Sequence, residues 1–151
     1  MSIKYYFEDL YVGRVFESGE CQVTRDEIIA FAREYDPQAY HLGEERSIAS
    51  LHEDVIASGW HVGSVCMRLL VDTLLKESSC LLSPGLDYLH WLKPLKPRDE
   101  VMMRAKVIEA RPSQRKPEIG VTKWVIELEN QDREVIFAMA PTILFARKNS
   151  D

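Results

Sequence analysis

Apolar residues recur at helical spacing in two stretches of the chain. In the first stretch they predict a helix from Arg25 to about Tyr35, with apolar positions at Ile28, Ile29, Phe31, Ala32 and Tyr35. Thr24 and Glu27 stand three residues apart in the pattern of a capping box, which marks where this helix begins. In the second stretch we expect a one-sided helix of about five turns with Ser58 as its N-cap, and with apolar positions at Val62, Val65, Cys66, Leu69, Leu70, Thr73 and Leu74.

The second half of the chain changes to alternation of apolar and polar residues, which is typical of strands with one buried face. One strand is predicted around apolar positions Val101, Met103, Ala105 and Val107, and the next around Trp124, Ile126 and Leu128. A polar loop with two prolines, residues 111–118, connects them. After a tighter turn at residues 130–132, a last strand is expected from about Glu134 to Ala146, in which Pro141 implies a bulge or an edge position.

Residues 86–92 form a further predicted strand with a different pattern. Tyr88 and Leu92 fall on one of its faces, and Leu89 and Trp91 on the other, so the pattern favours burial on both sides. A one-sided helix must bury its apolar stripe against another layer. The expected architecture is therefore of the α+β class, an antiparallel β-sheet wrapped around a long central helix.

Composition agrees with one folded domain spanning residues 1–151. The chain is 46% hydrophobic, enough for a single core, and its net charge of −5 argues against nucleic-acid binding. No apolar run approaches the length of a membrane span, and the first residues do not resemble a signal peptide, so we expect a cytoplasmic protein. Cys21, Cys66 and Cys80 lack metal-binding spacing and are expected to be reduced.

Candidate chemistry centres on the segment Asp36-Pro37-Gln38-Ala39-Tyr40-His41. Pro37 disfavours helical backbone at Asp36, so its carboxylate is expected to project from the end of the first helix, with His41 within reach after one turn of loop. A carboxylate beside an imidazole forms an acid/base pair. The alternative is an ordinary turn with a solvated histidine.

The start of the second helix supplies another candidate. Its unpaired backbone N–H groups and its dipole suit a developing oxyanion, and Gly59 lets a substrate carbonyl approach closely. Alternatively, Ser58 and Gly59 only cap a core helix. His61 either lines the pocket or packs inside. The adjacent His52, Glu53 and Asp54 cannot converge on one metal ion by themselves.

Four ordered motifs together carry a family resemblance that covers nearly the whole chain. They are YFEDLYVG at 6–13, FAREYDPQAYH at 31–41, IASGWH at 56–61 and LHWLKPLKPRD at 89–99. In this order they resemble the MaoC-like dehydratases, which are similar to R-specific enoyl-CoA hydratases and have the hot-dog fold. Two segments differ from the family pattern at the expected pocket entrance, namely Leu42-Gly43 after the histidine and residues 51–54 before the IASG stretch.

The resemblance implies specific roles for several residues. Asp36 and His41 would be the catalytic pair and Gly59 would supply an oxyanion-hole N–H. Substrate-binding positions are expected at Tyr40, Ser58, Trp60 and His61; the rings of Tyr40 and Trp60 would shape an acyl pocket and exclude water. The implied reaction is reversible hydration of a trans-2-enoyl thioester to a 3-hydroxyacyl thioester.

The same resemblance bears on partners. We expect no metal or redox cofactor, a substrate carried on coenzyme A or acyl carrier protein, and a homodimer with the active site between protomers. Cations that would meet the carrier's phosphates, or that are simply solvated, are Lys93, Lys96, Arg98, Arg111, Arg115 and Lys116. Two alternatives remain: an acyl-CoA thioesterase on the same fold, and a non-catalytic acyl-binding subunit.

Overall fold

The computed structural model describes residues 2–44 and 54–149. Two short 3-10 turns, η1 (Phe7–Asp9) and η2 (Leu75–Glu77), accompany three α-helices and six strands. The helices are α1 (Arg25–Tyr35), α2 (Ala39–Leu42) and α3 (Gly59–Thr73). The strands are β1 (Val15–Glu17), β2 (Cys21–Gln22), β3 (Cys80–Trp91), β4 (Glu100–Pro112), β5 (Ile119–Glu129) and β6 (Val135–Ala146).

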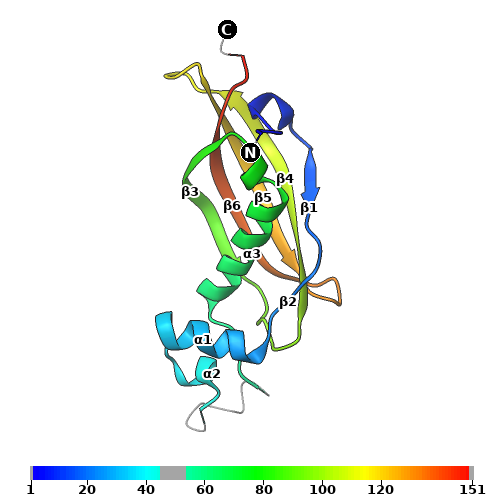
Figure 1. The fold of residues 1–151 in the computed structure, drawn as a ribbon, viewed down its shortest axis with the longest axis vertical. Helices are drawn as coiled ribbons and strands as arrows, with labels where there is room; N and C mark the ends of the chain where they lie inside the picture. Colours follow the sequence, from blue (N-terminus) through cyan, green and yellow to red (C-terminus); the bar gives the residue numbers. More distant parts are fainter. Residues whose placement is uncertain (1, 45–53, 150–151) are drawn as a thin grey trace.

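The strands form one antiparallel sheet in the order β1-β4-β5-β6-β3, and β2 also pairs with β4. Figure 1 shows α3 lying along one face of this sheet, with α1 and α2 gathered at one end of the molecule. The predicted arrangement of a sheet around a central helix is confirmed. The consequence for the site is that the end of α1, all of α2 and the start of α3 lie at the same end of the fold.

The core follows the predicted alternation. Val101, Met103, Ala105 and Val107 of β4 and Trp124, Ile126 and Leu128 of β5 are fully buried, and α3 contributes Val62, Cys66 and Leu70. Full burial of a large apolar side chain stabilises a fold by roughly 1.5–3 kcal/mol. At 15 residues, α3 has about four turns rather than the expected five, because the chain tightens into η2 after Leu74.

The prediction for β3 needs correction, whereas β6 spans Val135–Ala146 much as expected. The strand expected at residues 86–92 begins earlier, at Cys80, and most of it is exposed, whereas its pattern predicted burial on both faces. The reason is its place at the edge of the sheet, where β6 is its neighbour among the described strands. β6 itself lies inside the sheet, so of the two expectations for Pro141, a bulge or an edge position, the structure supports an irregularity in the pairing and not the edge. The pairing of Pro141 with Leu86 falls between two register shifts, which accommodate the missing N–H.

Three smaller observations concern the edge strands, the helix lengths and the cysteines. The short strands β1 and β2, which were not predicted, close the other edge of the sheet against β4. In the part of the chain that the structure describes, no helix has both the length and the apolar character needed to cross a membrane. All three cysteines are free, and burial raises the pKa of the Cys66 thiol to about 12, so it is a packing residue.

Candidate active site

The capping box predicted for α1 is present and sets where the helix begins, and the helix ends at Asp36. Thr24 Oγ1 accepts a hydrogen bond from the Glu27 backbone N–H at 3.2 Å, and the last turn closes with the Asp36 N–H donating to the Ala32 carbonyl at 2.9 Å. Asp36 then leaves the helical region with φ −152° and ψ 65°, as the following proline requires. The acidic side chain is therefore released at the helix terminus.

His41 reaches Asp36 by a route that differs from the prediction. Residues 39–42 form the one-turn helix α2 rather than a loop, and Gly43 ends it in the left-handed region at φ 69°. The His41 backbone N–H donates to the Gln38 carbonyl at 2.9 Å, which fixes the turn. The short helix directs the imidazole into the protein, where it is only 4% exposed.

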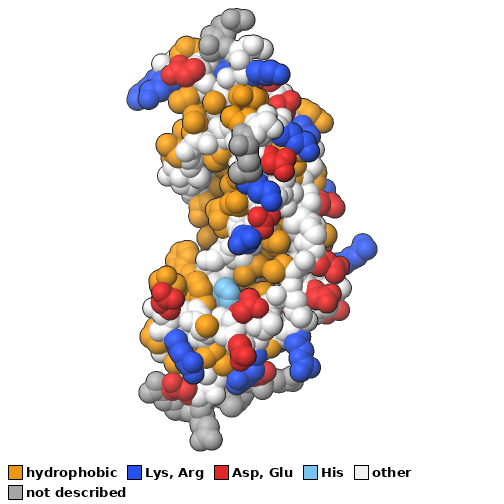
Figure 2. Space-filling model, in the orientation of Figure 1, with side chains coloured by type: hydrophobic (Ala, Val, Ile, Leu, Met, Phe, Trp, Pro, Cys, Tyr) orange, Lys and Arg blue, Asp and Glu red, His pale blue; other side chains and the backbone are white. Residues whose placement is uncertain are grey.

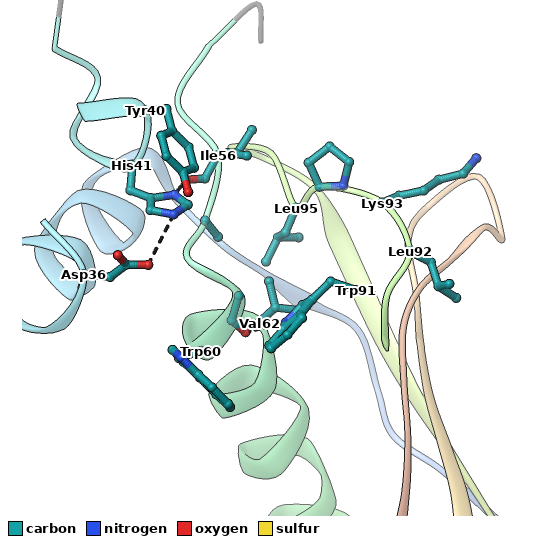
Figure 3. Close-up of a pocket in the computed structure, with 13 residues that line it drawn as sticks. Asp36, Tyr40, His41, Ile56, Trp60, Val62, Trp91, Leu92, Lys93 and Leu95 are labelled. Carbon is teal, nitrogen blue, oxygen red and sulfur yellow. Dashed lines mark hydrogen bonds and ion pairs between the residues drawn. The ribbon is translucent and has the colours of Figure 1, made fainter. Parts of the chain in front are cut away.

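Asp36 and His41 do form a pair. His41 Nε2 lies 3.3 Å from Asp36 Oδ2, and His41 Nδ1 lies 2.7 Å from the Ile56 carbonyl oxygen (Figure 3). A carbonyl oxygen can only accept, so Nδ1 must carry a proton. In the neutral ring Nε2 is then the basic nitrogen, and it faces the carboxylate. This second contact orients the ring and fixes its tautomer.

The environment of Asp36 favours its ionised form. Burial alone would raise the pKa of this carboxyl, but a hydrogen bond from Gln38, the nearby Ser58 hydroxyl and the positive charge that His41 carries when it is protonated together hold the pKa below its ordinary value. The Ser58 Oγ atom is buried and has no hydrogen-bond partner among the described residues. Its influence on Asp36 is therefore one of proximity.

Gly59 begins α3, as predicted, and its surroundings are crowded. Trp91 Nε1 donates to the Gly59 carbonyl at 2.8 Å, and the indole lies against the glycine Cα. The first hydrogen bond of the helix runs from the Val62 N–H to the Ser58 carbonyl, which leaves the preceding N–H groups without intrahelical acceptors. Ser58 occupies the N-cap position but its side chain does not cap the helix.

A cavity of about 450 Å³ joins these elements. Its walls are Asp36, Tyr40, His41, Ile56, Ala57, Gly59, Trp60, Val62, Trp91, Leu92, Lys93, Pro94 and Leu95. Figure 3 shows the Asp36–His41 pair on one side and Trp91 and Leu92 across from it, with the Lys93 side chain pointing away. The cavity is thus apolar apart from the pair and the rim, which suits an acyl chain.

Sequence reasoning placed five of its seven site residues on this cavity. They are Asp36, Tyr40, His41, Gly59 and Trp60. It did not single out the far wall, formed by Trp91, Leu92 and Leu95. The signal was available, because the motif at residues 89–99 was recognised, but its pattern was interpreted as a strand buried on both sides.

Ser58 and His61 lie outside the cavity walls. The His61 ring stacks on Phe31 of α1, with centroids 4.7 Å apart and planes 8° from parallel, and is 8% exposed. Its Nδ1 has no hydrogen-bond partner among residues 2–44 and 54–149. The ring therefore packs between α3 and α1 in this structure, the second of the two readings that the sequence allowed.

The packing of His61 predicts a pH-dependent stability. Burial lowers the pKa of His61, and the Glu27 carboxylate raises it by less. Below the ordinary histidine pKa of 6.5, His61 binds a proton in the unfolded chain but stays neutral in the folded protein. The free energy of unfolding therefore falls as the pH drops from 7.5 to 5.5. His61→Phe keeps a ring on Phe31 and should give a flatter dependence. Urea unfolding of both proteins at each pH measures this; equal slopes would contradict it.

Of the segments that differ from the family pattern, the structure describes Leu42, Gly43 and Asp54. Leu42 is half-buried and Gly43 exposed at the end of α2. His52 and Glu53 lie outside the described residues, while Asp54 forms an ion pair with Arg25 at 3.4 Å.

Within the described residues, no group of three or more His, Cys, Asp and Glu side chains is placed to hold a metal ion. Lys93 forms an ion pair with Glu134 at the rim of the cavity.

Comparison with solved structures places this chain in a known family. The chain is 34% identical to the MaoC-like dehydratase from Rhodospirillum rubrum, with a TM-score of 0.88 over 95% of this chain and 98% of that one. The chain belongs to the MaoC-like dehydratase family. No family model matches it.

Two more distant structures share the fold. A Mycobacterium tuberculosis protein with a double hot-dog fold aligns over 97% of this chain and 45% of its own, at 14% identity and a TM-score of 0.77. The unliganded R-hydratase PhaJ1 of Pseudomonas aeruginosa aligns over 95% of this chain and 86% of its own, at 18% identity and a TM-score of 0.70. The hot-dog fold expected from the sequence is confirmed, and the family is one of hydratases and dehydratases.

Proposed function

We propose that this protein reversibly hydrates a trans-2-enoyl thioester to a 3-hydroxyacyl thioester. The observation that carries the proposal is the Asp36–His41 contact of 3.3 Å on the wall of an apolar cavity that also contains Gly59 at the start of α3. An acid/base pair and a helix N-terminus facing one cavity are the groups that water addition to a conjugated thioester requires.

The pair would act on one water molecule. With Asp36 ionised and His41 Nε2 unprotonated, the carboxylate oxygen and the ring nitrogen both accept hydrogen bonds. A water molecule can therefore donate one hydrogen bond to each of them and keep a lone pair for attack on the β carbon. As the C–O bond forms, one proton passes to the pair and the double-bond electrons move to the α carbon and the thioester oxygen. The pair then returns the proton to the α carbon. Both additions come from one side of the substrate, so hydration is syn.

The start of α3 would hold the oxygen on which charge develops. The Gly59 N–H has no intrahelical acceptor, and the helix dipole adds a favourable potential at this end. Such a donor contributes about a hundredfold to a thousandfold to the rate. The proposed reaction moves only protons and electron pairs, so it uses no redox cofactor. Coenzyme A or acyl carrier protein would be the substrate's carrier.

The test follows two bonds of the substrate at the same time, the conjugated carbon–carbon double bond and the thioester bond. Purified protein is mixed with crotonyl-CoA, and the absorbance of the conjugated enoyl group is followed while free thiol is measured in parallel. Loss of absorbance without thiol release is the expected result. Thiol release would instead identify a thioesterase, and no reaction would favour an acyl-binding subunit. The Asp36→Asn variant, prepared in the same way, exposes any hydratase contributed by the expression host.

We also propose that the protein is a homodimer joined through β3. The outer edge of β3 lacks a neighbouring strand among the described elements, and its exposed apolar side chains are Leu81, Leu82, Leu86, Tyr88 and Trp91. Figure 2 shows hydrophobic side chains along the side of the molecule where β3 lies. An exposed apolar edge of this kind favours pairing with another strand. Trp91 also lines the cavity, so a second copy on β3 would lie beside the site.

The dimer proposal predicts the effect of a charge on β3. Leu86→Lys should convert the dimer to a monomer, because the cation would be desolvated at the interface. Light scattering during size-exclusion chromatography measures the mass. Ile108→Lys is the matched control, since Ile108 is an exposed apolar residue on β4 with nearly the same exposure, 45% against 47%. A Leu86→Lys protein that stays dimeric would rule out β3 as the interface.

A further inference from the structure

Gln38 lies between the two members of the pair and contacts both. Its side-chain Nε2 donates to Asp36 Oδ1 at 2.6 Å, the shortest of the polar contacts made by this carboxylate. The other carboxylate oxygen, Oδ2, faces His41. Because each oxygen has one such contact, the amide fixes the rotation of the carboxylate and thereby which oxygen is presented to the imidazole.

The backbone of Gln38 holds the same two residues. Its N–H donates to the Asp36 carbonyl at 2.8 Å, and its carbonyl accepts from the His41 N–H at 2.9 Å. Gln38 occupies the N-cap position of α2, yet its side chain makes no capping hydrogen bond and turns back to Asp36 instead. The Gln38 side chain thus contacts Asp36 instead of capping α2, and the Gln38 backbone is hydrogen-bonded to both Asp36 and His41.

We propose that Gln38 is a positioning residue of the Asp36–His41 pair, an inference that rests on the proposed hydratase function. Its side chain orients the carboxylate and its backbone sets the distance to the imidazole. Gln38 is not among the cavity walls, so it acts through Asp36 and not on the substrate. Its removal should therefore change turnover more than substrate binding.

The Gln38 amide acts on Asp36 as a hydrogen-bond donor. An amide N–H stabilises the ionised carboxylate, and this hydrogen bond lowers the pKa of Asp36, as do the Ser58 hydroxyl at the start of α3 and the charge of His41 on α2. A methionine has similar length but no donor. A glutamate would place a second carboxylate against Oδ1 and raise the pKa of Asp36 by repulsion.

The experiment uses Gln38→Met and Gln38→Glu, with Gln114→Met as the control because Gln114 is exposed in the turn between β4 and β5. For Gln38→Met we expect kcat for crotonyl-CoA to fall about threefold to tenfold with KM nearly unchanged, because water can partly replace an exposed amide. Gln38→Glu should lose more at neutral pH. The control should match the wild type in both constants.

A second measurement separates positioning from a general structural role. The carboxyl carbon of Asp36, labelled with carbon-13, is titrated by NMR in each protein, and its pKa should rise in Gln38→Met and rise further in Gln38→Glu. An unchanged Asp36 titration in Gln38→Met would overturn the proposal, even if kcat fell. An inactive wild-type protein would reject the hydratase function alone, since the NMR titration reports the Gln38 contact without any substrate.

Discussion

Asp36→Asn should lower kcat for hydration of crotonyl-CoA by about a thousandfold, within the range found for loss of a general acid/base group. Asparagine has nearly the same shape but cannot accept a proton from water at neutral pH. Its amide would also donate to His41 Nε2, 3.3 Å away in the wild type, and so occupy the basic nitrogen. KM should change little because the size of the cavity is preserved. Steady-state kinetics on the purified variant measures both constants.

Two controls make this prediction sharp. The variant should unfold in one cooperative transition with a midpoint only slightly below that of the wild type, because asparagine keeps the packing of Asp36 and loses only the interactions that lower the pKa of its carboxyl. The double variant with His41→Gln should be no slower than the slower single variant, since the two residues act on one water as a unit. Retention of more than a tenth of the wild-type kcat by Asp36→Asn would show that the pair is not the catalytic group.

The pair was predictable because its determinants are local. Thr24 and Glu27 fix the start of α1, and Pro37 fixes where it ends, so the chain itself delivers Asp36 to the end of the helix. The position of His41 depends on local residues too, but through a helical turn closed by Gly43 that the spacing alone did not reveal. Short helices of this kind are set by tertiary contacts, here the Ile56 carbonyl on the imidazole.

The rest of the site depends on contacts between distant segments. Trp91 reaches the carbonyl of Gly59, 32 residues earlier, and no local pattern encodes that hydrogen bond. Trp60 and Val62 line the cavity, while His61, which stands between them in the sequence, packs against α1. Which of these side chains faces the substrate is decided by where α1 lies. The exposure of β3 follows likewise from its edge position, which alternation does not determine.

Gly59→Ala should lower kcat about a hundredfold and destabilise the fold by about 1–3 kcal/mol. An added methyl group would lie 2.7 Å from Trp91 Cε2 and 2.8 Å from its Nε1, closer than side-chain atoms pack. The indole is held in place by its hydrogen bond to the Gly59 carbonyl and by an edge-to-face contact with Trp60. Either the indole or the first turn of α3 must move, and the N–H proposed to stabilise the oxyanion moves with that turn. Kinetics and urea unfolding of the variant measure the two effects.

Gly63→Ala provides the matched control on the same helix. A methyl group there would meet Phe137 at 3.9 Å, an ordinary contact, and alanine favours a helix interior over glycine by about 0.5–1 kcal/mol. This variant should keep its activity and be slightly more stable. Combining Gly59→Ala with Trp91→Leu should then recover part of the lost stability, because the smaller side chain leaves room for the methyl group. If Gly59→Ala costs as much stability in the Trp91→Leu background as in the wild type, contact with the indole is not the reason for glycine at this position.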